Sequence, residues 1–232
     1  MKVLVVESST SRLSLAWFEG NCFRAEESIE TERGRDSELF PALRRLLDRA
    51  GDSGGEAEMI LVGLGPGSYS GVRIGIAVAQ GLSLGWGARV AGRSSLLGLE
   101  VGESCADYHV VGDARRGLAW IARVCRGELR GEFVLQSTAE MEGLVQALLG
   151  QGAVVVTPAP PPLFPGVTVA RPRAELLGRV VFGRGDARLM EEGGNYGLEP
   201  IYLAPPYITQ ARKRRGTASR EARGEGELGT ET

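Results

Sequence analysis

The segment from Met59 to Trp86 constrains the fold of this chain more than any other part of the sequence. It reads MILVGLGPGSYSGVRIGIAVAQGLSLGW. This pattern predicts a buried strand over Met59–Leu64, a tight turn over Gly65–Ser68 and a helix that begins near Ser70. The strand, turn and helix together indicate an α/β protein.

The helix predicted after this turn is unusually apolar. From Gly71 to Gly85 its strongly polar side chains are Arg73 and Gln80. A surface helix normally carries one apolar stripe and a polar back. We therefore expect this helix to be covered on two sides, one by its own sheet and the other by a second surface.

Small residues recur along the same helix, at Gly71, Gly75 and Ala79 and again at Gly81 and Gly85. Glycine inside a helix costs up to about 1 kcal/mol relative to alanine, so several together need a reason. One explanation is close packing within the chain's own domain. The other, which the all-round apolar character favours, is close approach of a helix from a partner.

Composition limits the class of protein. The 232 residues are 43% hydrophobic and 24% charged, with a formal net charge of −2, which creates no field that would attract nucleic acid or an anionic membrane. The three cysteines, Cys22, Cys105 and Cys125, are scattered and form no metal-binding spacing. No apolar stretch is long enough to span a bilayer. The sequence predicts a soluble cytoplasmic protein with reduced thiols.

The first part of the chain follows one order of elements. It predicts strands over Lys2–Glu7, Arg12–Glu19 and Asn21–Ile29, a helix from Asp36 or Ser37 to about Ala50, the strand and helix described above, a strand over Arg89–Ala91 and a short helix from Ser94 or Ser95. The third strand is the most polar, which places it near an edge of the sheet.

The second part repeats this order. It predicts strands over Tyr108–Gly112, Leu118–Cys125 and Glu128–Leu135, a helix over Thr138–Leu149, a strand over Ala153–Thr157, a proline-rich connector over Pro158–Pro162, helices over Ala174–Phe182 and Asp186–Glu191, and a strand-like piece over Pro200–Leu203. We therefore expect two lobes of related topology, over residues 1–104 and 105–207, followed by a disordered charged tail over 208–232.

The glycine-rich turn invites comparison with phosphate loops, because a strand, a glycine turn and a helix aim backbone N–H groups at an anion. GPGSYSG does not match GxGxxG, however, and no GK[ST] supplies the lysine of a P-loop. The alternative is a glycine turn that lets strand and helix pack closely.

Few residues could carry chemistry. The single histidine, His109, lies in a predicted strand, so neither a zinc site nor a catalytic triad has enough groups. Glu7, Ser8, Ser9 and Thr10 form the better candidate, because a carboxylate and hydroxyls at a strand end can hold a magnesium-bound phosphate. A solvated polar turn is the alternative interpretation.

Several motifs resemble the TsaB family: VLVVESSTSRLSLAW, SELFPALRRLL, GLGPGSYSGVRIGIAVAQGLSLG, VVGDARRGLAW and EPIYLA, in that order over roughly residues 2–204. The resemblance implies a non-catalytic subunit of the bacterial machinery that places N6-threonylcarbamoyl on tRNA adenosine beside the anticodon. It also implies the two-lobed fold of actin, sugar kinases and heat-shock ATPases, in a degenerate paralogue of the catalytic subunit TsaD.

The resemblance further implies a partner surface on the two helices over 36–50 and 70–85, which would dock against TsaD or a second copy of the chain. The residues predicted to form it are Leu39, Leu43, Leu46, Gly71, Val72, Arg73, Gly75, Ile76 and Ala79. TsaE is the second implied partner, tRNA is reached only through the complex, and no cofactor, metal or membrane is expected. Arg73 is expected to cap the helical bundle with an ion pair.

The sequence departs from the family pattern at three positions. Glu7 stands where the family has Asp, Ala204 stands where it has Arg, and Asp36 stands where His is common. The longer carboxylate of Glu7 weakens the case for a phosphate or metal role at the first turn.

Rival interpretations belong to other classes of protein. A small ATP-dependent kinase or ATPase would place a nucleotide between the lobes, near Glu7 and Asp113. A metal peptidase lacks histidine ligands. Direct tRNA binding through the basic run Arg212–Arg215 competes with the simpler view of a solvated tail.

Overall fold

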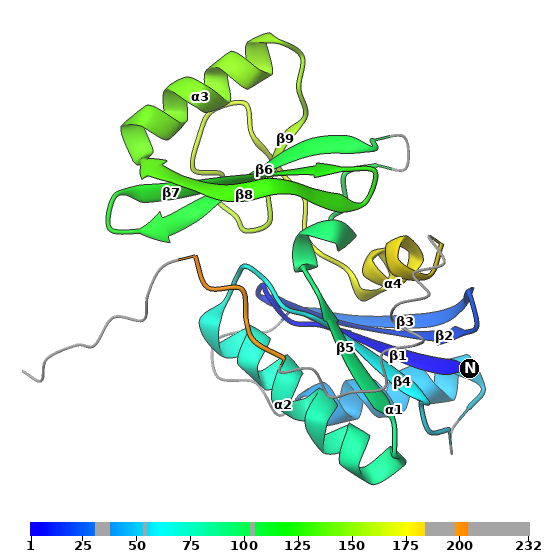
Figure 1. Ribbon diagram of the computed structural model, residues 1–232. Coiled ribbons are helices and arrows are strands. Elements are labelled where there is room, and N and C mark those ends of the chain that lie inside the picture. The colour runs from blue at the N-terminus through cyan, green and yellow to red at the C-terminus, as the bar shows by residue number, and fades with distance from the viewer. Residues whose placement is uncertain (31–37, 53–54, 103–104, 184–197, 204–232) are drawn as a thin grey trace, which may run out of the picture.

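The computed structural model describes residues 1–30, 38–52, 55–102, 105–183 and 198–203 (Figure 1). These residues form two five-stranded mixed sheets flanked by helices, one sheet in each of two lobes. The α/β fold class predicted from the sequence is confirmed.

The first sheet contains the amino-terminal strands. They are β1 (Lys2–Glu7), β2 (Arg12–Glu19), β3 (Cys22–Glu30), β4 (Met59–Gly63) and β5 (Arg89–Arg93), in the order β3-β2-β1-β4-β5. β1 runs antiparallel to β2 and parallel to β4. β3 lies at the edge, as its polarity predicts, and the continuous apolar runs of β1 and β4 are buried in the centre.

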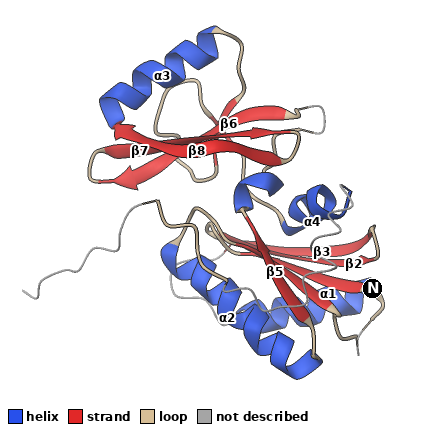
Figure 2. Ribbon diagram, in the orientation of Figure 1, coloured by secondary structure: helices blue, strands red, loops and turns tan. Residues whose placement is uncertain are grey.

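Helices cover both faces of this sheet (Figure 2). α1 (Leu39–Ala50) and α2 (Tyr69–Trp86) pack on one face against Leu4 and Val6. α4 (Ala174–Gly183) packs on the other face against Val3 and Val5. Successive residues of β1 therefore point to opposite faces, each into its own core.

The second sheet follows the same plan. Its strands are β6 (Asp107–Arg115), β7 (Leu118–Cys125), β8 (Glu128–Ser137), β9 (Val155–Thr157) and β10 (Thr168–Val169), in the order β10-β9-β6-β7-β8. α3 (Thr138–Gly150), which begins with a capping box between Ser137 and Glu140, covers one face. The short 3-10 helix η2 (Ser95–Gly98) contributes Leu96 to the core on the other face.

The two sheets have the same strand order, because β6, β7, β8, β9 and β10 occupy the positions of β1, β2, β3, β4 and β5, respectively. In both lobes three antiparallel strands lead into a helix and then into a strand that returns parallel to the first. The predicted repeat of topology is thus present. The proline-rich connector Pro158–Pro162 lies between β9 and β10, where the first lobe has α2 between β4 and β5.

The chain returns to the first lobe after completing the second sheet. The sequence predicts that 105–207 belong to the second lobe, yet α4 is buried against the first sheet through Ala174, Leu177, Val181 and Phe182. The reason is that the face of β1 and β2 turned away from α1 and α2 is also apolar. α4 covers this face and completes the first core.

Two local expectations need correction, and one strand was not expected. Pro200–Leu203 forms no strand, and the short strand β10 is additional. The capping position of α1 is Glu38, whose side chain makes no capping hydrogen bond. Several predicted features lie outside the described residues: the capping residues Asp36 and Ser37, the helix Asp186–Glu191, Ala204 and the tail over 208–232.

Among the described helices, none has the length and apolar character needed to cross a membrane.

Two chain segments connect the lobes, and they pair with each other. Leu99 and Pro172 form an isolated antiparallel bridge, the Glu100 amide donates to the Arg171 carbonyl (3.1 Å) and the Arg173 amide donates to the Gly98 carbonyl (2.9 Å). Arg12 at the start of β2 forms ion pairs with Glu30 (3.2 Å) and Glu100 (2.9 Å), which fastens these connections to the first sheet.

Arg173 forms several ion pairs at this junction. It forms ion pairs with Glu26 and with Glu175 (2.7 Å). The Glu26 side chain is only 10% exposed and also accepts from the Ser14 hydroxyl (2.8 Å) and the Glu175 amide (3.2 Å). A carboxylate this enclosed destabilises the fold unless a cation is paired with it.

We expect Arg173→Met to lower the free energy of unfolding by about 1–2 kcal/mol, because Glu26 would stay buried without its charged partner. Urea unfolding measures the change. Arg130→Met is the matched control, since Arg130 and its partner Glu128 are both about half exposed and the change should stay within about 0.5 kcal/mol. Equal losses in the two variants would contradict this role of Arg173.

Candidate functional site

The glycine turn between β4 and α2 is closed by hydrogen bonds within the chain. The Gly65 amide donates to the Ser95 hydroxyl (3.0 Å), the Ser68 amide donates to the Ser9 carbonyl (2.6 Å) and the Gly71 amide donates to the Ser68 hydroxyl (3.2 Å). A phosphate loop keeps such amides for its ligand. These three amides serve the fold instead.

The glycines of this region accommodate the turn between β1 and β2. A methyl group on Gly67 or Gly71 would lie 2.1 Å from the carbonyl oxygen of Ser9 or Ser8, respectively. On Gly75 it would lie 2.4 Å from the Ser8 hydroxyl. The Ser8 hydroxyl also donates to the Gly71 carbonyl (2.9 Å). Gly71 and Gly75 therefore permit close packing inside the lobe, not approach of a partner helix.

This packing corrects the predicted partner surface. Of its nine residues, seven are buried in the first lobe, Gly71 is half-buried and Arg73 is exposed; the buried ones are Leu39, Leu43, Leu46, Val72, Gly75, Ile76 and Ala79. Six of these seven are part of the core between the helices and the sheet. A side chain buried in its own core has no surface left for a partner.

The opposite face of α2 is exposed and mostly small or apolar. Ala77, Gly81, Leu84 and Gly85 lie on it, and Leu84 is 87% exposed. Nothing approaches within 4 Å of a methyl group built on Gly81 or Gly85. This exposed face is the one available to the second covering surface that the apolar pattern of the helix predicts.

Two tyrosines and an arginine lie at the amino-terminal end of the exposed face. The Arg73 Nε donates to the Tyr202 hydroxyl (3.1 Å), and the Arg73 guanidinium lies 4.4 Å from the centre of the Tyr69 ring. The Tyr69 and Tyr202 rings are 5.9 Å apart. Arg73 is thus held by aromatic residues of its own chain, a role that differs from the predicted ion pair.

Glu7 lies at the base of the glycine turn and is completely buried. Its Oε1 accepts from the Ser9 amide (2.7 Å), and its Oε2 has no hydrogen-bond partner among the described residues. Burial raises the pKa of the Glu7 carboxyl, and hydrogen bonds from Ser9 and neighbouring groups oppose this only in part. A methyl group on Gly63 would lie 1.8 Å from Oε2, so the carboxylate is tightly enclosed.

The remaining residues of the predicted turn site are enclosed in the same way. Ser8 and Ser9 are buried, and Thr10 is half-buried with its hydroxyl bonded to the backbone of Arg12. Among the described residues the Glu7 side chain is fully buried, so its carboxylate presents no exposed surface to a magnesium-bound phosphate. The structure brings Glu7, Ser8 and Ser9 together as a packing unit.

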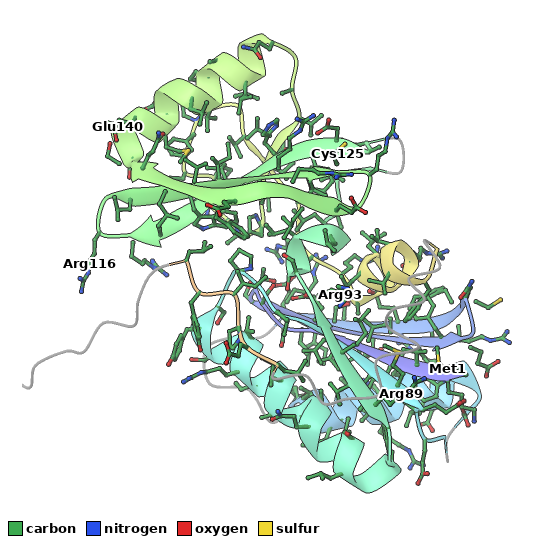
Figure 3. The ribbon with its side chains drawn as sticks, viewed as in Figure 1. Met1, Arg89, Arg93, Arg116, Cys125 and Glu140 are labelled. Carbon is green, nitrogen blue, oxygen red and sulfur yellow. The ribbon has the colours of Figure 1, made fainter. Side chains whose placement is uncertain are left out.

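Asp113 and His109 do not join this unit. Asp113 is exposed at the end of β6 and accepts from the Arg115 amide (2.6 Å), and Arg116 of the same hairpin projects outward (Figure 3). His109 is half-buried in β6, where burial lowers its pKa. Within the described part of the chain, no three His, Cys, Asp or Glu side chains form a group that could hold a metal ion.

A polar pocket of about 350 Å³ lies beside the connections between the lobes. Its lining includes Arg12 and Arg173 together with Glu26, Glu30 and Glu100. Both arginines are already paired with these glutamates. Glu30 is also paired with Arg171, which does not line the pocket, so each of the five charged lining residues already has an ion-pair partner within the junction.

The architecture defines the fold class. Two lobes with the same strand order, each a mixed five-stranded sheet flanked by helices, have the fold of actin and the sugar kinases.

A family model described as "TsaD: tRNA N6-adenosine threonylcarbamoyltransferase" matches residues 30–151. The chain belongs to this family and, within it, to the TsaB proteins.

Individual relatives and solved structures agree with this family assignment. The tRNA threonylcarbamoyladenosine biosynthesis protein TsaB of Escherichia coli is 31% identical over 102 residues, 44% of each chain, and that of Haemophilus influenzae is 28% identical over 142 residues, 57% of this chain and 58% of the relative. The aligned part thus spans about half the length of these relatives. YeaZ from Pseudomonas aeruginosa superposes with a TM-score of 0.63 and 25% identity over 87% of this chain and 99% of its own.

A second Pseudomonas aeruginosa structure, described as an uncharacterized protein with similarity to peptidase YEAZ, has a TM-score of 0.67 at 24% identity, covering 88% of this chain and 99% of that one. This likeness confirms the fold. The family resemblance found in the sequence is confirmed by the relatives.

Proposed function

We propose that this chain is a non-catalytic scaffold subunit for N6-threonylcarbamoyl modification of tRNA adenosine next to the anticodon. It binds TsaD and positions it, and the chemistry takes place on TsaD. TsaE joins the same assembly, and tRNA is reached through the complex. The observation that carries the proposal is the exposed face of α2.

The composition of this face suits a helical partner. Leu84 is almost fully exposed, and an exposed large apolar side chain among small residues is typical of an interaction site. Ala77, Gly81 and Gly85 leave the helix backbone accessible, so a partner helix can approach closely. Tyr69 and Arg73 at one end are residue types that contribute strongly to interfaces.

The enclosed state of the first turn supports a non-catalytic role. A nucleotide-dependent kinase needs a carboxylate that reaches a metal-bound phosphate and amides that are available to it. Glu7 is fully buried, and the Gly65 and Ser68 amides are donated to Ser95 and Ser9. We therefore place the ATP-dependent activities of the assembly on its other subunits.

The test is Leu84→Glu in the full chain. We expect this variant to bind TsaD at least about 30-fold more weakly, because a carboxylate buried in an apolar interface costs about 2 kcal/mol or more. Isothermal titration calorimetry with purified TsaD measures the affinity. The melting temperature should not change, since the side chain is 87% exposed.

Leu144→Glu is the matched control, because Leu144 is a 37% exposed leucine on α3 of the other lobe. It should bind TsaD like the parent chain. Sedimentation of the isolated chain shows whether Leu84→Glu also abolishes self-association through the same face. Parent-like affinity of Leu84→Glu for TsaD would refute the proposed docking face.

A further inference from the structure

Residues 198–203 are separated in sequence from every element they contact. In Figure 1 this segment, coloured orange, runs beside α2 and ends at the level between the two lobes. Leu198 packs against the core formed by α1, α2 and the first sheet. Leu203 packs against the core of the second lobe, which contains Tyr108 and Trp120. One short segment is therefore anchored in both lobes.

The middle of the segment is attached by polar contacts. The Ile201 amide donates to the carbonyl of Leu64 (2.9 Å), the residue that follows β4 at the start of the glycine turn. The Tyr202 hydroxyl accepts from the Arg73 Nε on α2. An apolar anchor at each end and two hydrogen bonds between them fix the path of the segment along its length.

We propose that residues 198–203 form a strap that joins the second lobe to α2 and holds the two lobes in one relative orientation. Six extended residues can reach about 20 Å, which is enough to cross between neighbouring cores. The covalent connections pair at Leu99 and Pro172, and the strap adds a separate, noncovalent link at the glycine turn. Two separate attachments restrict rotation about either one.

This inference goes beyond the proposed function and does not depend on it. The strap also contributes Tyr202 to the exposed face of α2, so a partner docked there would meet the second lobe at a fixed angle. Without the strap, the described lobes would be joined at one side only, by the paired connections and by η2, whose Leu97 packs against the cores of both lobes. Rotation about this junction would then become accessible.

The lobe orientation can be measured by the distance between two spin labels in the full chain. Cys22 on β3 is exposed, and Gln151 after α3 is exposed on the other lobe. Labels at Cys22 and Gln151→Cys, with Cys105→Ser and Cys125→Ser to remove the other thiols, report the separation of the lobes by pulsed electron paramagnetic resonance. The parent should give one narrow distance distribution.

Two variants release the strap at different points. Leu203→Asp places a charge at the anchor in the second lobe, and Ile201→Pro removes the amide that donates to Leu64. We expect each to widen the distance distribution at least about twofold. Glu199→Gln, at an exposed position of the strap, should keep the parent distribution.

Parent-like widths in both strap variants would overturn the proposal. If one variant fails to fold, as judged by circular dichroism, the other still decides. Leu84→Glu, which tests TsaD docking, should leave the distance distribution unchanged. The strap and the docking face can therefore fail independently.

Discussion

Replacing Gly71 by alanine is expected to lower the free energy of unfolding by about 3 kcal/mol. The added methyl group would lie 2.1 Å from the carbonyl oxygen of Ser8, an atom of the backbone that cannot rotate away. Relief requires the β1–β2 turn and the start of α2 to separate, which also strains the hydrogen bond from the Ser8 hydroxyl to the Gly71 carbonyl. In a chain of this size the melting temperature should fall by roughly 10 °C.

Gly81→Ala is the control within the same helix. No atom lies within 4 Å of the methyl group built there, so the change removes only the conformational cost of glycine. We expect it to leave stability unchanged or to raise it by up to about 1 kcal/mol. Thermal and urea unfolding of both variants measure the difference. Equal effects at the two positions would show that the inward packing of Gly71 is not what stabilises the turn.

Glu7→Gln is expected to make the protein more stable than the parent at neutral pH, by an amount that grows with pH. Burial raises the pKa of the Glu7 carboxyl above its usual value of 4.5, because ionisation inside the core loses hydration. Between the unfolded and the native pKa, the native state keeps a proton that the unfolded state has lost. The stability of the parent therefore falls as pH rises through this window, by about 1.4 kcal/mol per pH unit.

Glutamine has the same shape and stays neutral, so the stability of the variant does not fall as the pH rises. Its advantage should vanish below about pH 4.5, where the carboxyl is protonated in both states. Urea unfolding between pH 4 and pH 8 gives the two stability curves. Glu142→Gln, on the exposed side of α3, should follow the parent curve. A constant difference between Glu7→Gln and the parent at every pH would contradict a buried neutral acid.

Most of the fold could be predicted from local sequence patterns. The strand over Lys2–Glu7 and the helix after Ser68 are where the apolar runs and glycine turn predict them. The last segments were less predictable, because Pro200–Leu203 has an extended, apolar pattern but no neighbouring strand to pair with. The order of elements along the chain likewise does not predict that α4 packs on the first sheet.

Most residues of the partner surface predicted on α2 lie on the face of this helix that packs inward. Ala77 and Leu84 follow Gly75 by two and nine residues, which at 3.6 residues per turn places both roughly opposite to it. That geometry separates the two faces, yet it does not say which one packs inward. The pair Gly81 and Gly85 was the signal available for the outward face, since these glycines do not continue the spacing of Gly71 and Gly75.

The sequence by itself determined the two-lobed topology, the glycine turn and the apolar character of α2, because these follow from local periodicity and from backbone conformation. The tertiary structure alone decided what the glycines contact. The carbonyl of Ser8 and the hydroxyl of the same residue occupy the space that side chains at Gly71 and Gly75 would need. The exposed surface is therefore left to Ala77, Gly81 and Leu84, since a helix that uses one face for its own core can offer a partner only the other.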